Sequence, residues 1–222
     1  MTELADRLAS VDAAIADAVR DAGRDPAGIT RIVVTKFHPA SLIRELAQLG
    51  VTDVGENRHQ EAQAKAAELA DLGLAWHFVG QLQRNKARQV RAYARAVHSV
   101  DRAALADALG GASPLDVFIE LNLTDDAGRG GVVPADAEAL AEHVLSVPGL
   151  RLRGVMAVAP IGAEPRAAFS RVRAASERVR SVAPDADAIS AGMSADFRDA
   201  ILEGATHLRI GTAITGKRST SG

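Results

Sequence analysis

The chain of 222 residues contains no cysteine, which excludes disulfide bonds, thiolate nucleophiles and cysteine-ligated metals. No apolar run approaches the roughly 20 residues of a membrane-spanning helix, and the first residues lack the basic and apolar regions of a signal peptide. The net charge of -2 gives no reason to expect nucleic acid as a partner. We therefore expect a cytoplasmic protein that does not bind a membrane and for which nucleic acid is not the main partner.

Two kinds of segment alternate along the chain. From residue 31 onward, short β-branched runs alternate with alanine-rich helical stretches. The predicted strands are 31–35, 51–54, 75–79, 95–99, 116–121, 152–158, 187–190 and 206–210. The predicted connecting helices lie near 40–49, 57–71, 84–94, 101–109, 134–146, 165–182 and 194–203. This rhythm predicts an α/β fold with a parallel sheet.

Eight parallel strands can close into a barrel or spread into an open, doubly wound sheet. No Gly-x-Gly-x-x-Gly motif follows the first strand, so a single (β/α)8 TIM barrel is favoured. No long helix follows the last strand, and we expect the amphipathic N-terminal segment 4–19 to complete the outer ring. Residues 1–216 are predicted to form one domain, and residues 217–222 a flexible polar tail.

A lysine closes the first predicted strand. In a TIM barrel the functional groups gather at the C-terminal ends of the strands, and Lys36 stands there, just before Phe37, His38 and Pro39. An amine that forms a Schiff base must spend time neutral, and burial at a strand end would favour that form. Position alone also fits a lysine that merely extends its charge to solvent.

Small and hydroxyl residues follow strands seven and eight, where barrels often bind phosphate. Ser194 follows Gly192 and Met193, and Gly211 precedes Thr212. Ser194 could equally be the N-cap of the next helix, and Gly211 and Thr212 could form a simple turn. Together with Lys36, these residues suggest pyridoxal 5'-phosphate, bound covalently at one end and by its phosphate at the other.

Further candidates lie at the same strand ends. Arg209 could face a pyridine nitrogen, and a guanidinium that only donates would keep that nitrogen unprotonated. The ring would then be a weaker electron sink than one paired with aspartate; a structural ion pair is the alternative role. Asn57 could contact the cofactor or, with Gln60, form a capping box. Met156 could lie against a flat ring or pack in the core.

The remaining polar motifs point to structure rather than chemistry. The six histidines show no His-x-His or His-x-x-x-His pair, so no metal site is expected, and His77 and His98 are predicted to be hydrogen-bonded strand residues. A basic stripe recurs at helical spacing through Arg84, Arg88, Arg91 and Arg95. Its simplest interpretation is a solvated helix face, with contact to an acidic partner or RNA as the alternative.

The chain resembles the YggS/PROSC family of pyridoxal-phosphate homeostasis proteins over nearly its whole length. The motifs that carry the resemblance are Val33–Lys36, Gly55–Arg58, Trp76–Lys86, Gly154–Ala157, Gly192–Phe197 and Arg209–Ile214. The resemblance implies a barrel like the N-terminal domain of alanine racemase, with pyridoxal 5'-phosphate held as an internal aldimine on Lys36. It also implies that Ser194, Gly211 and Thr212 hold the phosphate and that Arg209 faces the ring nitrogen. Met193 belongs to one of these motifs and is expected to line the cofactor. The chain departs from the family at Gln81, often a histidine, and in loop 124–131.

By this resemblance the chain is expected to act in pyridoxal-phosphate homeostasis and amino-acid balance without turnover of its own. Its expected partners are the cofactor and pyridoxal-phosphate-dependent apo-enzymes, and a monomer is expected. The alternative is an amino-acid racemase, which needs a second base, commonly a tyrosine, and the chain offers only Tyr93. A third hypothesis is an interaction scaffold in which the cofactor is incidental.

Overall fold

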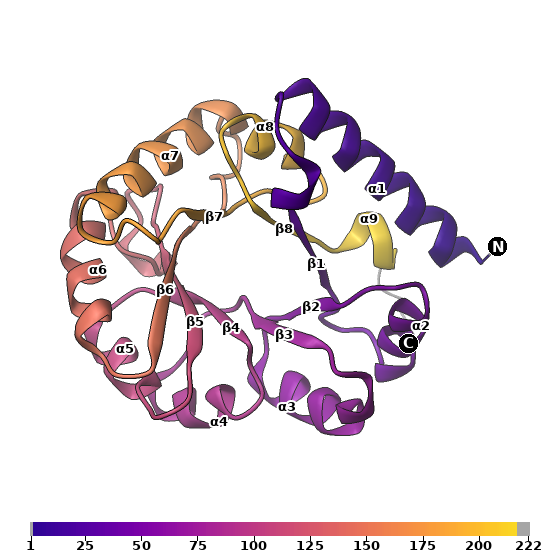
Figure 1. Cartoon of the computed structure of the whole chain (residues 1–222), viewed down its shortest axis with the longest axis horizontal. Coiled ribbons are helices and arrows are strands. Elements are labelled where there is room, and N and C mark those ends of the chain that lie inside the picture. Colours follow the sequence, from indigo (N-terminus) through magenta and orange to yellow (C-terminus); the bar gives the residue numbers. More distant parts are fainter. Residues whose placement is uncertain (1, 217–222) are drawn as a thin grey trace.

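A closed barrel of eight parallel strands forms the centre of the molecule (Figure 1). The computed structural model describes residues 2–216, so the predicted tail 217–222 lies outside the described residues. The strands are β1 (Thr30–Val34), β2 (Asp53–Glu56), β3 (Ala75–Phe78), β4 (Ala96–Val100), β5 (Leu115–Glu120), β6 (Leu150–Met156), β7 (Ala188–Ser190) and β8 (His207–Ile210). Each strand pairs with its neighbours in sequence, and β1 pairs with β8 to close the ring. The predicted TIM barrel is confirmed.

Helices surround the barrel as an outer ring (Figure 1). They are α1 (Glu3–Asp21), α2 (Ala40–Gln48), α3 (His59–Glu68), α4 (Ala87–Arg91), α5 (Ala103–Leu109), α6 (Ala137–Ser146), α7 (Pro165–Val182), α8 (Phe197–Leu202) and α9 (Thr212–Thr215). Short 3-10 turns lie at Pro26–Gly28, Ala70–Leu72, Arg84–Lys86, Ala127–Arg129 and Pro134–Asp136. No helix within residues 2–216 has the length and apolar character to span a bilayer.

The N-terminal helix completes the outer ring, as expected. Thr2 caps α1 by accepting a hydrogen bond from the Ala5 N–H at 3.3 Å. The apolar stripe of α1 is buried, and the helix packs against α8 and α9. The short helix α9 was not expected, because a four-residue segment is too short to show a periodic pattern.

The predicted helix 84–94 is too long, and the predicted basic stripe along one helix face is therefore wrong as well. Only Ala87–Arg91 is α-helical, after the 3-10 turn Arg84–Lys86. Arg91 bonds the Leu109 carbonyl at 2.7 Å, and Arg95 pairs with Asp116 at 3.7 Å. Arg84 and Arg95 lie outside the helix, so the stripe does not run along one helix face.

The barrel interior is unusually polar. Its apolar part includes a small cluster of Ala96, Phe118, Met156 and Ala188, whereas branched aliphatic residues normally fill such barrels. Side chains from β3, β4, β7 and β8 complete the interior with His77, His98, Ser190 and Arg209, all buried. Buried polar groups are costly unless they are bonded to one another, so this interior must be held by hydrogen bonds.

Candidate functional site

Lys36 lies at the C-terminal mouth of the barrel, two residues after β1 ends. It occupies a turn in which Phe37 has a φ of 68°, an uncommon conformation for a residue other than glycine. The Lys36 side chain is exposed, so the expectation that burial surrounds this amine is wrong. The turn instead leads the chain outward, and it is held by the Phe37 N–H, which donates to Glu61 Oε2 at 3.2 Å.

A buried ion pair lies directly beneath this turn. Lys65 Nζ donates to Glu56 Oε1 at 2.7 Å and to the Thr35 carbonyl at 3.1 Å. The Thr35 hydroxyl donates to the same carboxylate oxygen at 2.7 Å. Burial raises the pKa of Glu56, and the bonds from Lys65 and Thr35 oppose that rise. Sequence reasoning missed this pair, because Glu56 and Lys65 read separately as a strand-end acid and a helix-surface lysine.

The loops after β7 and β8 are joined by Ser194. Its Oγ accepts from the Ala213 N–H at 3.3 Å, which connects the β7 loop to the start of α9. The predicted N-cap role of Ser194 is wrong, because α8 begins only at Phe197. The loop before α8 is closed instead by Asp196, whose carboxylate accepts from the Met193 N–H at 2.6 Å. The hydroxyl of Ser194 therefore faces the β8 loop.

Backbone N–H groups without partners gather at this junction. Within residues 2–216, the N–H groups of Ser194, Gly211 and Thr212 donate no hydrogen bond. A Cβ added to Gly211 would meet only Val34, at 3.6 Å. Protein packing therefore does not itself fill the space beside Gly211, and a ligand could approach the backbone there closely. The arrangement fits an anion such as a phosphate.

Arg209 projects from β8 into the barrel and is 5% exposed. Its guanidinium donates to the carbonyl and the hydroxyl of Ser190, both at 2.7 Å, and to the Ala157 carbonyl at 2.8 Å. Burial lowers the pKa of Arg209 to about 10. The group therefore stays cationic at neutral pH and acts only as a donor.

Asn57 follows β2 and is not a helix cap. Helix α3 starts at His59 with Arg58 in the cap position and no capping side chain, so the predicted capping box with Gln60 is wrong. Asn57 Oδ1 is buried and has no hydrogen-bond partner among the described residues. A buried acceptor without a partner is costly, and a bound ligand that donates to it would remove that cost.

The two methionines predicted to contact the cofactor, Met156 and Met193, lie in different surroundings. Met156 ends β6 and packs inside the barrel with Phe118, buried beneath the mouth. This fits the core role that the sequence left open. Met193, in the loop after β7, is 38% exposed. The structure thus brings Met193 to the same rim as Ser194, while Met156 lies inside the barrel, below that rim.

Glu120 is a site residue that sequence reasoning missed. It ends β5, and its Oε2 is buried without a partner in the described part of the chain. Burial raises the pKa of Glu120 to about 7, and Asp101 adds to the rise while Arg209 and Arg129 oppose it. A buried carboxyl whose pKa is shifted close to neutrality is a mark of functional sites. Its position at a strand end was the available signal.

Other polar residues at the mouth organise loops. Gln81 Nε2 donates to the Arg129 carbonyl at 3.2 Å, which joins the loops after β3 and β5. Asn122 Oδ1 accepts from the Thr124 N–H at 2.9 Å, and its amide donates to the Asp126 carbonyl at 2.8 Å. Tyr93 lies beside Trp76 and α3 in the outer layer, with its hydroxyl near His59 at the start of α3.

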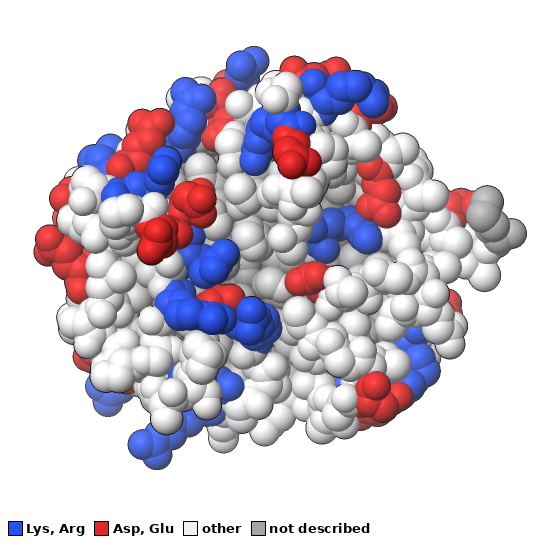
Figure 2. Space-filling model, in the orientation of Figure 1, with Lys and Arg blue, Asp and Glu red and all other residues white. Residues whose placement is uncertain are grey.

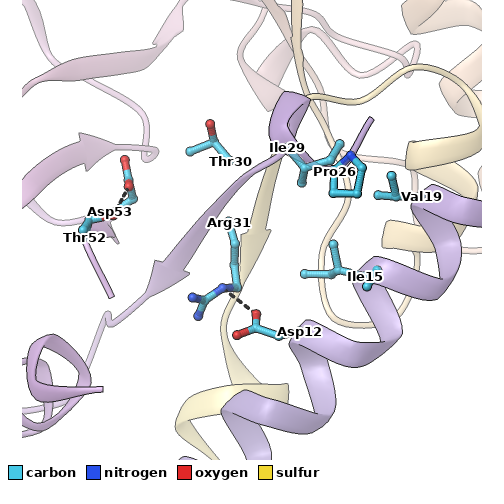
Figure 3. Close-up of a pocket in the computed structure, with 10 residues that line it drawn as sticks. Asp12, Ile15, Val19, Pro26, Ile29, Thr30, Arg31, Thr52 and Asp53 are labelled. Carbon is cyan, nitrogen blue, oxygen red and sulfur yellow. Dashed lines mark hydrogen bonds and ion pairs between the residues drawn. The ribbon is translucent and has the colours of Figure 1, made fainter. Parts of the chain in front are cut away.

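The opposite end of the barrel has hollows of its own. One lies between α1 and β1, where Arg31 and Asp12 point toward each other (Figure 3) and pair at 2.8 Å. Thr30 and Asp53, which begin β1 and β2, line it, so it lies at the far ends of the strands from Lys36. Figure 2 shows residues of both charge signs interspersed over the face in view. No single sign dominates that face.

The chain matches the family described as alanine racemase, N-terminal domain, over residues 27–219. Among curated proteins, it is 44% identical to the pyridoxal phosphate homeostasis protein of Pseudomonas aeruginosa, covering 98% of this chain and 97% of that one. It is 38% identical to the protein of the same name from Escherichia coli, covering 100% of this chain and 99% of that one.

Solved structures agree with these matches. PipY of Synechococcus elongatus with pyridoxal phosphate bound has a TM-score of 0.80 and 35% identity, over 96% of this chain and 99% of that one. Alanine racemase from Corynebacterium glutamicum has a TM-score of 0.66 and 17% identity, over 89% of this chain and 57% of that one, and shows the shared fold alone. The closed barrel, its strand-end site and the match over residues 27–219 agree: the chain belongs to the alanine racemase N-terminal domain family.

Proposed function

We propose that this protein binds pyridoxal 5'-phosphate at the C-terminal mouth of its barrel and serves in the homeostasis of that cofactor. Relatives that match almost its whole length are named pyridoxal phosphate homeostasis protein, and PipY has been solved with pyridoxal phosphate bound. The supporting observation in this chain is a convergence at the ends of three adjacent strands. An exposed primary amine follows β1, unpartnered backbone N–H groups follow β7 and β8, and a buried guanidinium lies between them.

The residues at the mouth fit the chemistry of that cofactor. When bound, pyridoxal phosphate supplies an aldehyde that reacts with a primary amine, and Lys36 offers the amine. The free N–H groups of Ser194, Gly211 and Thr212 suit its phosphate. Asn57 offers an acceptor that nothing else in the described chain uses. Met193 and Met156 offer polarisable, apolar contacts at the rim and below it.

Arg209 decides which chemistry the site favours. Its pKa of about 10 keeps the guanidinium protonated at neutral pH. A donor facing the ring nitrogen holds that nitrogen unprotonated, which weakens the ring as an electron sink. A site built in this way suits storage and release of the cofactor better than formation of a carbanion. We therefore propose a carrier and regulator without turnover of its own.

The racemase alternative lacks its second base. Tyr93 lies in the outer layer, where its hydroxyl is 3.5 Å from His59 Nδ1. Burial raises the pKa of Tyr93, and the charge of Glu56 adds to the rise. A tyrosine that holds its proton this firmly is a poor base. We expect no racemisation when the loaded protein is incubated with single enantiomers of free amino acids; racemisation abolished by Lys36→Ala would overturn the carrier proposal.

The binding proposal is tested by absorbance and covalent trapping. The protein incubated with pyridoxal phosphate should show a visible band, and borohydride should fix one label that peptide mapping finds on Lys36. Lys36→Ala should lose both. A wild-type protein that stays colourless after incubation would refute the proposal.

Transfer of the cofactor is tested separately. Pyridoxal-phosphate-dependent apo-enzymes are the proposed recipients, and a monomer is the proposed state. Activation of a recipient apo-enzyme by the loaded protein should exceed that by the same amount of Lys36→Ala mixed with cofactor. Partner capture that is indifferent to loading would favour the scaffold hypothesis instead, and sedimentation reports the oligomeric state.

A further inference from the structure

A continuous line of hydrogen bonds crosses the inside of the barrel. Arg209 Nη1 lies 2.7 Å from Ser190 Oγ, and Ser190 Oγ lies 2.8 Å from His98 Nδ1. His98 Nε2 lies 2.9 Å from His77 Nδ1, and His77 Nε2 lies 2.9 Å from Asp53 Oδ1. These residues belong to β8, β7, β4, β3 and β2. The line joins a cation at the C-terminal mouth to a carboxylate at the opposite end of the strands.

The two ends of this line fix the direction of its first and last bonds. A guanidinium can only donate and an ionised carboxylate can only accept. Burial raises the pKa of Asp53, but the hydrogen bonds from His77 and Thr52 outweigh it, so the pKa lies below its usual value and the group is ionised at neutral pH. Burial lowers the pKa of His98 well below its usual value, so its ring carries one proton.

The direction then follows step by step. Ser190 Oγ accepts from Arg209, so its own proton is free to go to His98 Nδ1. When His98 Nδ1 accepts that proton, His98 carries its single ring proton on Nε2, which donates to His77 Nδ1. His77 in turn donates from Nε2 to Asp53. All four bonds then point from Arg209 toward Asp53, and each strengthens the next because His77, His98, Ser190 and Arg209 are buried and the bonds are aligned.

One other placement of the protons gives every atom in the line a hydrogen-bond partner except one. If His77 carried two ring protons, it would donate to both His98 and Asp53, and His98 would donate from Nδ1 to Ser190. The Ser190 hydroxyl proton would then have no acceptor in the line. A buried donor without a partner is costly, so the one-way arrangement is favoured, and the two can be told apart by where the ring protons lie.

The far end of the line opens to a small cavity of about 140 Å³. Asp53 and His77 line it, together with the charged groups Arg95, Asp116 and Arg153. His207 lines it as well, and its ring packs 5.1 Å from Phe118, which also stacks on His98 at 4.3 Å. His207 bonds Thr206 Oγ1 at 2.8 Å, and its ring meets that of His98 edge-on at 6.2 Å, but it makes no hydrogen bond in the line. It therefore serves as a control for the loss of a neighbouring ring without the loss of a hydrogen bond in the line.

We propose that Ser190, His98 and His77 are positioning residues for Arg209, joined with Asp53 in a one-way hydrogen-bonded relay that holds the guanidinium in place at the mouth. The relay itself is inferred from hydrogen-bond distances that involve no cofactor, whereas its purpose rests on the proposed function. A barrel interior could be filled more cheaply by aliphatic residues. The polar line is explained if the orientation of Arg209 toward the cofactor ring depends on it.

The relay is tested first without any cofactor. Long-range proton–nitrogen correlation spectra of cofactor-free protein with isotope-labelled histidine report which ring nitrogen carries the proton. His98 and His77 should each be protonated at Nε2 and unprotonated at Nδ1. A proton on His98 Nδ1, or two protons on His77, would overturn the relay, and this measurement needs no variant to fold.

The positioning role is tested with a matched pair of variants. His98→Phe keeps a ring stacked on Phe118 but breaks the relay, and His207→Phe changes a ring against the same Phe118 but leaves the relay intact. His98→Phe should shift the visible band of the bound cofactor and weaken its binding about tenfold, the effect of one bond to a charged group. His207→Phe should keep the wild-type band and affinity.

The outcomes separate the two proposals. Equal spectra and affinities for His98→Phe and His207→Phe would overturn the positioning role, as would a band shift of equal size in both. A wild-type protein that fails to bind pyridoxal phosphate would refute the proposed function, while the proton positions on His98 and His77 would still decide whether the relay exists.

Discussion

Glu120→Gln should stabilise the cofactor-free protein, and the gain should depend on pH. The pKa of Glu120 rises from 4.5 to about 7, mainly through burial. Each tenfold change in proton affinity is worth about 1.36 kcal/mol, so ionising this carboxyl costs the folded state about 3 kcal/mol. Because the folded pKa is raised, the contribution of the protonated group to stability is fully present below pH 4.5 and is lost as the pH rises to about 7.

Glutamine keeps the shape of Glu120 and removes its ionisation. The free energy of unfolding of the variant should equal that of the wild type at about pH 4 and exceed it by about 3 kcal/mol at about pH 8. Urea unfolding followed by the fluorescence of Trp76 at a series of pH values measures this difference. Glu45→Gln, at an exposed position on α2, is the control and should change stability by less than about 0.5 kcal/mol throughout. Parallel stability curves for Glu120→Gln and wild type would refute the argument that burial controls this carboxyl.

Three further predictions follow from buried contacts. Lys65→Met should lower the free energy of unfolding in urea by about 3–5 kcal/mol, because it leaves the Glu56 carboxylate buried without its cationic partner. Adding Glu56→Gln should restore much of that loss. If the losses of the two single variants simply add in the double variant, the two residues are not coupled. Asn57→Ala should leave the stability of the cofactor-free protein within about 1 kcal/mol of wild type, since Asn57 Oδ1 has no partner in the described chain. A binding titration should show weaker cofactor affinity. Unchanged affinity would show that Asn57 is not part of the cofactor site. Met156→Ala should cost about 2–5 kcal/mol by opening a cavity inside the barrel, and a thermal midpoint equal to wild type would show that Met156 is not packed there.

The local pattern of β-branched and apolar residues was sufficient to predict the strands of the barrel. The β-branched runs predicted every strand of the barrel to within two residues at each end, because strand and helix periodicities differ and the segments are short. The errors fall at helix ends, where the conformation of the preceding loop decides the boundary. Asp196 rather than Ser194 closes the loop before α8, and α3 begins without the cap that Asn57 was expected to supply.

The sequence by itself determined the barrel and the strand ends at which Lys36, Ser194, Arg209 and Gly211 stand, because parallel strands place their C-terminal ends on one side. Only the tertiary structure decided what surrounds these residues. Lys36 is exposed rather than buried, and the pKa of Glu120 is raised mainly by burial, which only the folded structure creates. The relay from Arg209 to Asp53 likewise exists because closure brings strands distant in sequence within hydrogen-bond distance, and no spacing along the chain encodes that distance.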